Sequence, residues 1–270
     1  MYPTLSSSTE VPNPEAEETR LLWSGGFDST FRLLSLVLRE KRAVQPFYLL
    51  EHQRRSTLHE LAAMDVIRRK LGARSPEAAG LLRPTRVFLV SEIAPHPEIT
   101  HRFQALARRF RVGPQFEWLP RFAAQHGYTD LELSIEKNAL RPREPVFAYL
   151  GEFLERDADD ARLRTPLADP DMLIFQPFRY PVYDLTKLEM LRQAGEFGFR
   201  DLLLDSWFCH RPRAGRPCGT CHPCVDAMEE GFSFRLPRPA RFRYRMNRIW
   251  RRTKAVIPAQ RFLRQIRARP

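Results

Sequence analysis

Arg20-Leu21-Leu22-Trp23-Ser24-Gly25-Gly26-Phe27-Asp28-Ser29-Thr30 is the stretch that decides the fold of this chain. It opens with a short apolar run, turns at two glycines, and leads into apolar residues at 31–38 that have helical rather than alternating spacing. This pattern predicts a strand, a glycine turn and a helix in direct succession. Parallel α/β sheets are built from units of this kind.

The remainder of the chain continues the alternation of strands and helices. Since strands that alternate with helices pair in parallel, we predict an α/β fold with a Rossmann-like parallel sheet covered by helices on both faces. Ligands of such folds bind beyond the carboxyl ends of the strands. The further strands are expected at 44–50, 86–91 and 130–135, and the helices at 58–71, 116–126, 145–160 and 185–194, with a short one after Cys224.

Length and composition fit one α/β domain with appendages. The 270 residues are 43% hydrophobic, which is ordinary for a protein with a packed core. No run of about eighteen apolar residues occurs, and the Ser-, Pro- and Glu-rich start is unlike a signal peptide, so a cytoplasmic protein is expected. We expect a disordered leader at 1–19, the main α/β domain at 20–207, a cysteine segment at 208–232 and a basic, partly helical tail at 233–270.

The glycine turn has the chemistry of a phosphate-binding loop. Gly25 and Gly26 let the backbone approach an anion, and the helix that follows directs its N–H groups and positive dipole end toward it. Hydroxyl groups of Ser24 and Ser29 would add donors, whereas the Asp28 carboxylate suits a metal ion or a helix cap. A lone Gly-Gly can also serve turn geometry alone. The complete string Ser24-Gly25-Gly26-Phe27-Asp28-Ser29, placed between a strand and a helix, favours ATP binding and resembles the signature of the PP-loop ATP pyrophosphatase superfamily.

All four cysteines of the chain fall within one short segment, at Cys209, Cys218, Cys221 and Cys224. Closely spaced thiols on tight turns are typical of structural zinc sites, and four of them complete a tetrahedral shell. An iron–sulfur cluster, a redox Cys-x-x-Cys pair and a sulfur-transfer thiol are the alternatives. We predict Zn²⁺ as the bound metal.

The phosphate loop followed by the cysteine cluster resembles the bacterial 7-cyano-7-deazaguanine synthases, a family of that superfamily. The resemblance covers residues 20–231 and is strongest at both ends. Smaller segments that agree with the family's pattern are Glu51-His52-Gln53-Arg54, His59-Glu60-Leu61-Ala62-Ala63, Pro177-Phe178, Thr186-Lys187-Leu188-Glu189 and Ser206-Trp207-Phe208-Cys209.

The resemblance implies an ATP-dependent carbon–nitrogen ligase. Such an enzyme adenylates 7-carboxy-7-deazaguanine with ATP and Mg²⁺, and ammonia then displaces AMP to give an amide, which a second ATP converts to a nitrile. Carried over, residues 24–29 would hold the pyrophosphate and its metal, with Asp28 catalytic. Lys187 would stabilise charge on the departing phosphate. On sequence alone, Lys187 could equally be a solvated residue in the first turn of a helix.

Two departures from the family bear on the substrate. The Tyr-Pro-Asp-Cys-Arg segment that faces the base has no counterpart, and the expected Pro-x-Arg-Asn has only the loose match Arg141-Pro142-Arg143-Glu144. These departures suggest a divergent member that acts on a related acid or uses another amine. Defence-related relatives that attach a deazaguanine to other targets are one analogy.

The net charge of +12 resides in the tail. Residues 235–270 hold twelve Arg, one Lys and no acidic residue, and the rest carries 31 basic and 32 acidic residues. A helix at 241–250 would place Phe242, Met246, Ile249 and Trp250 on one face, among arginines. Such helices bind RNA, anionic membranes or acidic proteins, and a solvated extension is the alternative.

Three functional hypotheses follow. The first is the deazaguanine-type synthase, with a small acid, ammonia or another amine as partners. The second is a tRNA-modifying PP-loop enzyme that holds RNA through residues 235–270. The third is a non-catalytic scaffold that presents the tail. A homodimer is a further hypothesis.

Overall fold

The computed structural model describes residues 18–137, 145–157 and 160–250, and these form a seven-stranded sheet of order β3-β2-β1-β4-β7-β6-β5. Neighbouring strands from β3 to β7 run parallel, whereas β6 pairs antiparallel with both β7 and β5. The strands are β1 (Thr19–Leu22), β2 (Val44–Leu50), β3 (Arg86–Leu89), β4 (Leu131–Glu132), β5 (Leu154–Asp157), β6 (Asp160–Leu163) and β7 (Phe178–Arg179).

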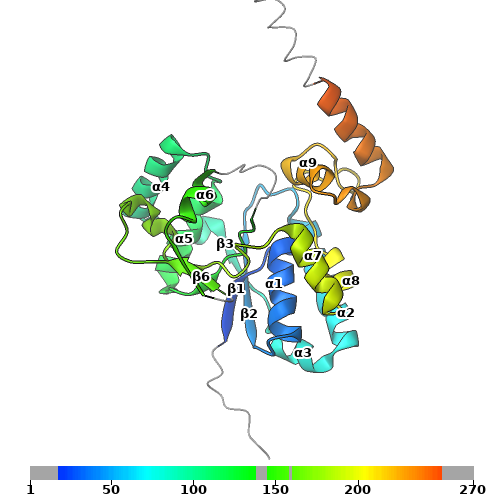
Figure 1. The fold of residues 1–270 in the computed structure, drawn as a ribbon, viewed down its shortest axis with the longest axis horizontal. Helices are drawn as coiled ribbons and strands as arrows, with labels where there is room; N and C mark the ends of the chain where they lie inside the picture. The colour runs from blue at the N-terminus through cyan, green and yellow to red at the C-terminus, as the bar shows by residue number, and fades with distance from the viewer. Residues whose placement is uncertain (1–17, 138–144, 158–159, 251–270) are drawn as a thin grey trace, which may run out of the picture.

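Helices cover both faces of the sheet (Figure 1). One face carries α1 (Phe27–Leu38), α2 (Thr57–Arg74), α3 (Pro76–Leu81), α7 (Lys187–Glu196) and α8 (Arg200–Leu204). The other carries α4 (Pro97–Arg109), α5 (Gln115–His126) and α6 (Pro145–Leu150), together with the short 3₁₀ helix η2 (Pro170–Phe175). The predicted fold class is confirmed.

Each face has its own hydrophobic core because neighbouring strand residues point to opposite sides. On β1, Leu21 belongs to the core beneath α1 and Leu22 to the core beneath α5. On β2, Tyr48 and Phe47 divide in the same way. These strands are apolar on both faces, as central parallel strands are.

Parts of the sequence-based assignment are wrong. The helix predicted over 145–160 ends at Leu150, and residues 154–157 form strand β5 of an antiparallel hairpin with β6. The strand predicted at 130–135 is reduced to Leu131–Glu132. Helices α3, α4 and α8, the 3₁₀ helix η1 (Val90–Glu92) and η2 were not anticipated.

The carboxyl-terminal part of the described chain forms a smaller unit beside the sheet domain. It comprises the cysteine segment, α9 (His222–Glu229), the 3₁₀ helix η3 (Ser233–Arg235) and a helix at residues 238–250, drawn in orange in Figure 1. The four cysteines, Leu236 and Ala240 form its buried core. Among the described residues, no helix is long and apolar enough to cross a membrane.

Candidate functional site

The phosphate-loop sequence lies at the carboxyl end of β1, near the middle of the sheet. Gly25 adopts a left-handed conformation with φ of +67°, and a Cβ atom there would lie 2.8 Å from the backbone oxygen of Glu60. Both the backbone conformation and the close approach of α2 therefore require glycine.

The loop ends at the amino terminus of α1, where Gly26 is the N-cap and supplies no side-chain cap. The N–H groups of the first turn are therefore available to an anion. The Ser24 Oγ accepts a hydrogen bond from the Gly26 N–H at 3.3 Å, and the Ser29 Oγ accepts one from the Ser24 N–H at 3.4 Å. These two hydrogen bonds fix the conformation of the loop at the amino terminus of α1.

Asp28 lies in the first turn of α1. Its Oδ1 is buried and has no hydrogen-bond partner among the described residues. Burial raises the pKa of this carboxyl, although the nearby charges of Lys187 and Arg235 act in the opposite direction. An under-coordinated buried carboxylate oxygen fits a cation such as Mg²⁺.

Lys187 is the first residue of α7. The amino terminus of this helix is stabilised by a capping box formed by Thr186 and Glu189. The Lys187 ammonium group contacts the Glu136 carboxylate and lies 3.6 Å from Glu230. Burial alone would lower the pKa of Lys187, but the carboxylates of Asp28, Glu136 and Glu230 outweigh it and raise that pKa above its ordinary value. Lys187 thus stays charged beside Asp28.

Three cavities meet at Asp28, with volumes of about 220, 260 and 720 Å³. The smallest lies between the phosphate loop and the cysteine segment, and the second lies over the ends of β1 and β2. The largest lies beyond β4, and its lining includes Lys187 and the rings of Phe116, Phe147 and Tyr183, as well as Glu136 and Glu230. A nucleotide and a second reactant could therefore occupy adjoining spaces around one carboxylate.

The wall shared by the two smaller cavities carries Arg54, which the sequence analysis cited only for the family resemblance. Glu60 accepts hydrogen bonds from Arg54 at 2.9 Å, Ser56 at 2.7 Å and Tyr48 at 2.8 Å. The buried carboxylate of Glu60 thereby fixes the Arg54 guanidinium at the cavity rim.

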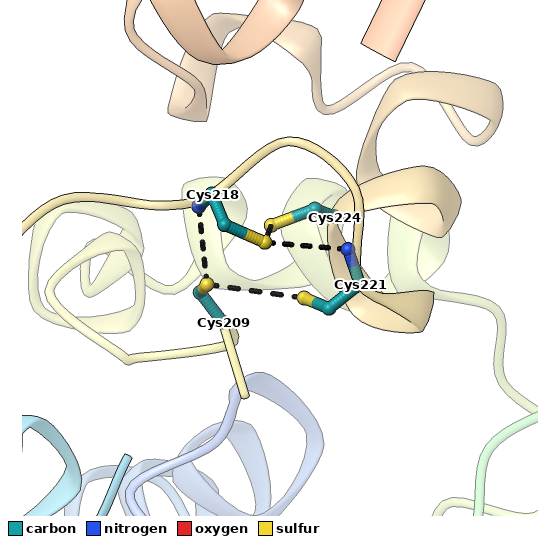
Figure 2. Close-up of side chains that lie close together, drawn as sticks. All are labelled: Cys209, Cys218, Cys221 and Cys224. Carbon is teal, nitrogen blue, oxygen red and sulfur yellow. Dashed lines mark hydrogen bonds between the residues drawn. The ribbon is translucent and has the colours of Figure 1, made fainter. Parts of the chain in front are cut away.

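The four cysteine sulfurs come together, all within 4.8 Å of one another (Figure 2). The Cys218–Cys224 and Cys209–Cys221 sulfur distances are 3.9 and 3.8 Å. Tetrahedral zinc with Zn–S bonds of about 2.3 Å needs sulfurs roughly 3.8 Å apart. Two of the sulfur pairs therefore have the separation that a tetrahedral zinc site requires, and the cluster could hold this metal.

Backbone donors surround the thiols in the manner expected for thiolates. The N–H of Cys218 donates to the Cys209 sulfur at 3.2 Å, and the N–H groups of Thr220 and Cys221 donate to the Cys218 sulfur at 3.3 and 3.2 Å. Such bonds favour the charged form of sulfur that binds a metal.

Arg235 belongs to this site although charge counting placed it in the basic tail. It lines the 220 Å³ cavity together with Ser24, Gly26, Asp28 and Lys187. The sequence around Arg235 contains no motif, so its place in the site becomes visible only in the folded structure.

The remaining predicted segments lie elsewhere. Helix 238–250 exposes Phe242, Met246, Ile249 and Trp250 to 64, 49, 55 and 55%. The proposed match at Arg141–Glu144, most of the leader and residues 251–270 of the tail fall outside the described residues.

Comparisons with known proteins leave the family open. No protein-family model matches the chain, and no curated protein matches it. Among solved structures, a 4-thiouridine synthetase in complex with RNA and ATP aligns with 82% of this chain at 16% identity and a TM-score of 0.32. The chain spans half the length of that protein. At this identity and TM-score the likeness assigns no function to this chain.

Proposed function

We propose that this chain is an ATP-dependent adenylating enzyme of the PP-loop ATP pyrophosphatase type, which activates a carboxylate and transfers nitrogen to it. The observation that carries the proposal is the glycine loop at the carboxyl end of β1, with Asp28 and Lys187 beside it at the junction of three cavities. An open helix amino terminus, a lysine and an unpartnered carboxylate oxygen supply what a nucleotide triphosphate and its metal need.

The proposed chemistry has two steps. A carboxylate oxygen of the acid attacks the α-phosphorus of ATP, the bond from that phosphorus to the α–β bridging oxygen breaks, and pyrophosphate leaves. The nitrogen of ammonia or another amine then attacks the acyl carbon, the bond to AMP breaks, and the nitrogen loses a proton. In deazaguanine-type chemistry the amide oxygen then attacks the α-phosphorus of a second ATP and pyrophosphate leaves; AMP departs with that oxygen, and the nitrogen loses its two protons to give a nitrile.

The roles of individual residues follow from their placement. Residues 24–29 would bind the pyrophosphate portion, Asp28 would hold Mg²⁺, and Lys187 would stabilise charge that develops on the leaving phosphate. Mg²⁺ would neutralise phosphate charge when bound. Zinc at Cys209, Cys218, Cys221 and Cys224 is structural, because four thiolates leave no open coordination position.

The substrate proposed is 7-carboxy-7-deazaguanine or a related acid. It rests on the sequence resemblance, and the 720 Å³ cavity next to Lys187 has room and aromatic walls for a planar base. Donor groups of such a base would meet the Glu136 and Glu230 carboxylates.

The test is to incubate the purified protein with ATP, Mg²⁺, ammonium and 7-carboxy-7-deazaguanine, and to quantify AMP and the mass of the base. We expect AMP together with an amide or nitrile product. Asp28→Asn and Lys187→Met should each lower AMP formation by about a hundredfold or more. Lys70→Met is the matched control, because Lys70 pairs with Asp205 on the surface.

Each alternative outcome has a distinct meaning. AMP without a converted base would keep the adenylation proposal and reject this acid. AMP formation that Asp28→Asn leaves unchanged would contradict the placement of the site. No AMP with any acid or RNA tested would favour the scaffold hypothesis.

RNA binding through the helix at 238–250 is a second candidate function. Arg245 and Arg248 are exposed on it beside the exposed Phe242 and Trp250 side chains, a mixture that suits phosphate contacts and base stacking. Changing Arg241, Arg245 and Arg248 to Gln should weaken tRNA binding and reduce its salt dependence. Binding that these changes do not alter would reject this role.

A further inference from the structure

The Arg235 guanidinium is an unusual cation because it lines a cavity without a carboxylate partner. Within residues 18–137, 145–157 and 160–250, no Asp or Glu oxygen forms an ion pair with it. Removal from solvent lowers its pKa to about 10, and the charges of Asp28 and Asp205 offset only part of that effect. A partly buried cation of this kind would be stabilised by a bound anion.

Arg235 is held firmly from one side. The guanidinium lies over the rings of Phe208 and Phe27, at 4.8 and 5.5 Å from their centroids. Its Nη2 donates to the backbone oxygen and the Oγ of Ser206, and at 3.5 Å to the Leu204 oxygen. All its hydrogen bonds to described residues use Nη2, so Nε and Nη1 remain available as donors.

The position of Arg235 relative to the phosphate loop identifies the anion. Phe27, which stacks on the guanidinium, is the first residue of α1, and Ser24, Gly26 and Lys187 line the same cavity. The helix amino terminus, the lysine and the arginine therefore lie around one small space, which Asp28, Glu60, Asp226 and Glu230 also line. Three positive elements suit a polyphosphate better than a single phosphate.

The cysteine segment fixes the chain that carries Arg235. Gly219 passes so close to Ala240 that a Cβ atom at position 219 would collide with the Ala240 backbone. The Arg243 Nε donates to the Cys218 carbonyl oxygen at 2.7 Å, and Leu236 packs in the core of the cysteine cluster. Three residues that follow Arg235 in the chain are thus tied to the cysteine segment that precedes it.

We propose that Arg235 binds the pyrophosphate portion of ATP, and that the cysteine segment serves to place this arginine opposite the phosphate loop. The identity of the anion rests on the proposed function. Arg235 contributes to ATP and pyrophosphate binding and makes no contribution to AMP binding, because its target is the leaving group.

The test measures binding of inorganic pyrophosphate, ATP and AMP to the full-length, zinc-loaded chain by calorimetry. Arg235→Gln should weaken pyrophosphate and ATP binding by roughly ten- to a hundredfold, which is the value of one or two charge-assisted hydrogen bonds. AMP binding should stay the same. Arg238→Gln is the matched control, since Arg238 is exposed three residues later.

A conservative variant guards against a folding defect. Arg235→Lys keeps the charge but loses the flat guanidinium group. Its affinity for pyrophosphate should therefore lie between those of the wild type and Arg235→Gln, and its affinity for AMP should be unchanged. Equal losses for AMP and pyrophosphate in both variants would mean a purely structural role and would overturn the inference. Pyrophosphate binding that neither variant weakens would also overturn it.

The two proposals fail separately. A wild type that forms AMP while Arg235→Gln binds pyrophosphate normally removes the Arg235 inference alone. A wild type that binds pyrophosphate through Arg235 but never forms AMP removes the adenylation proposal alone. A wild type that binds no pyrophosphate removes the Arg235 inference.

Discussion

The backbone N–H of Trp207 donates a hydrogen bond to the carbonyl oxygen of Gly25, with an N–O distance of 2.8 Å. Gly25 is the residue of the glycine loop with the left-handed backbone conformation, and Trp207 stands two residues before the first cysteine of the cluster. A hydrogen bond between backbone atoms therefore links the glycine loop to the segment that leads into the cysteine cluster. A second contact joins the rings of Phe27 and Phe232, whose centroids lie 5.3 Å apart, and Phe232 follows the cysteine cluster in the chain.

Removal of the metal should weaken pyrophosphate binding as well as loosen the cysteine segment. A strong chelator, or Cys224→Ser, would release the segment that holds Arg235 against the phosphate loop. We expect pyrophosphate affinity to fall by about tenfold or more, with recovery when zinc is restored to the chelated wild type. Calorimetry with metal analysis measures both, and unchanged affinity in the metal-free protein would contradict the connection.

Gly25→Ala should be more damaging than a glycine substitution with the same backbone angle elsewhere. Gly127 also has a φ of +67°, but a Cβ atom there would meet no atom within 4 Å. Gly127→Ala should thus cost about 1–2 kcal/mol of unfolding free energy from backbone strain. Gly25→Ala adds the collision with the Glu60 backbone and should also abolish ATP binding. If both variants lost the same unfolding free energy in urea and Gly25→Ala still bound ATP, the loop would tolerate a side chain at position 25.

Glu136 should give the protein a pH-dependent stability near neutrality. Burial raises the pKa of Glu136 to about 7, although Lys187 acts to lower it. Between its ordinary pKa of 4.5 and about 7, the folded protein retains a proton that the unfolded chain has released. The unfolding free energy of the wild type relative to Glu136→Gln should therefore fall as pH rises through this window, and level off above it. A difference that grows with pH in urea titrations would mean that Lys187 dominates and lowers the pKa.

Loss of the buried ion pair between α1 and β4 should lower the free energy of unfolding far more than loss of an exposed ion pair nearby. Arg32 donates from Nε and Nη2 to the two Glu132 oxygens, both at 2.7 Å, with side-chain exposures of 8 and 5%. Glu132→Ala would leave the arginine buried and only partly compensated by Glu40, at a cost of about 3–5 kcal/mol. Asp130→Ala removes the exposed pair with Arg20 and should cost about 0–1 kcal/mol. Similar losses in chemical unfolding would refute this difference.

The parts of the fold that follow from local pattern could be predicted from the sequence. The strand at 44–50 and the helix at 116–126 have apolar periodicity and clear boundaries, and the structure places β2 and α5 there. The strand at 154–157 was missed because its residues Leu-Glu-Arg-Asp have little β character, and its stability comes from pairing with β6. Tertiary pairing outweighs local propensity at such edges.

The site divides in the same way. Residues 24–29 and the cysteine cluster are contiguous motifs, so their chemistry could be inferred before the geometry. Glu136 comes from one segment, Glu230 and Arg235 come from another, and only the folded chain brings them to Lys187 and Asp28. Arg235 is the clearest case, because composition assigned it to the basic tail.

Two contacts connect the first strand-turn-helix unit to segments that come much later in the chain. Gly25 contacts Trp207, just before the cysteine segment, and Phe27 contacts Phe232, at its end. Closing contacts between such distant segments costs chain entropy that only the finished fold repays. During synthesis on the ribosome, the glycine loop emerges early and remains uncovered until the cysteine segment follows. A message cut short between these segments would encode a chain with an open phosphate loop and no wall opposite it.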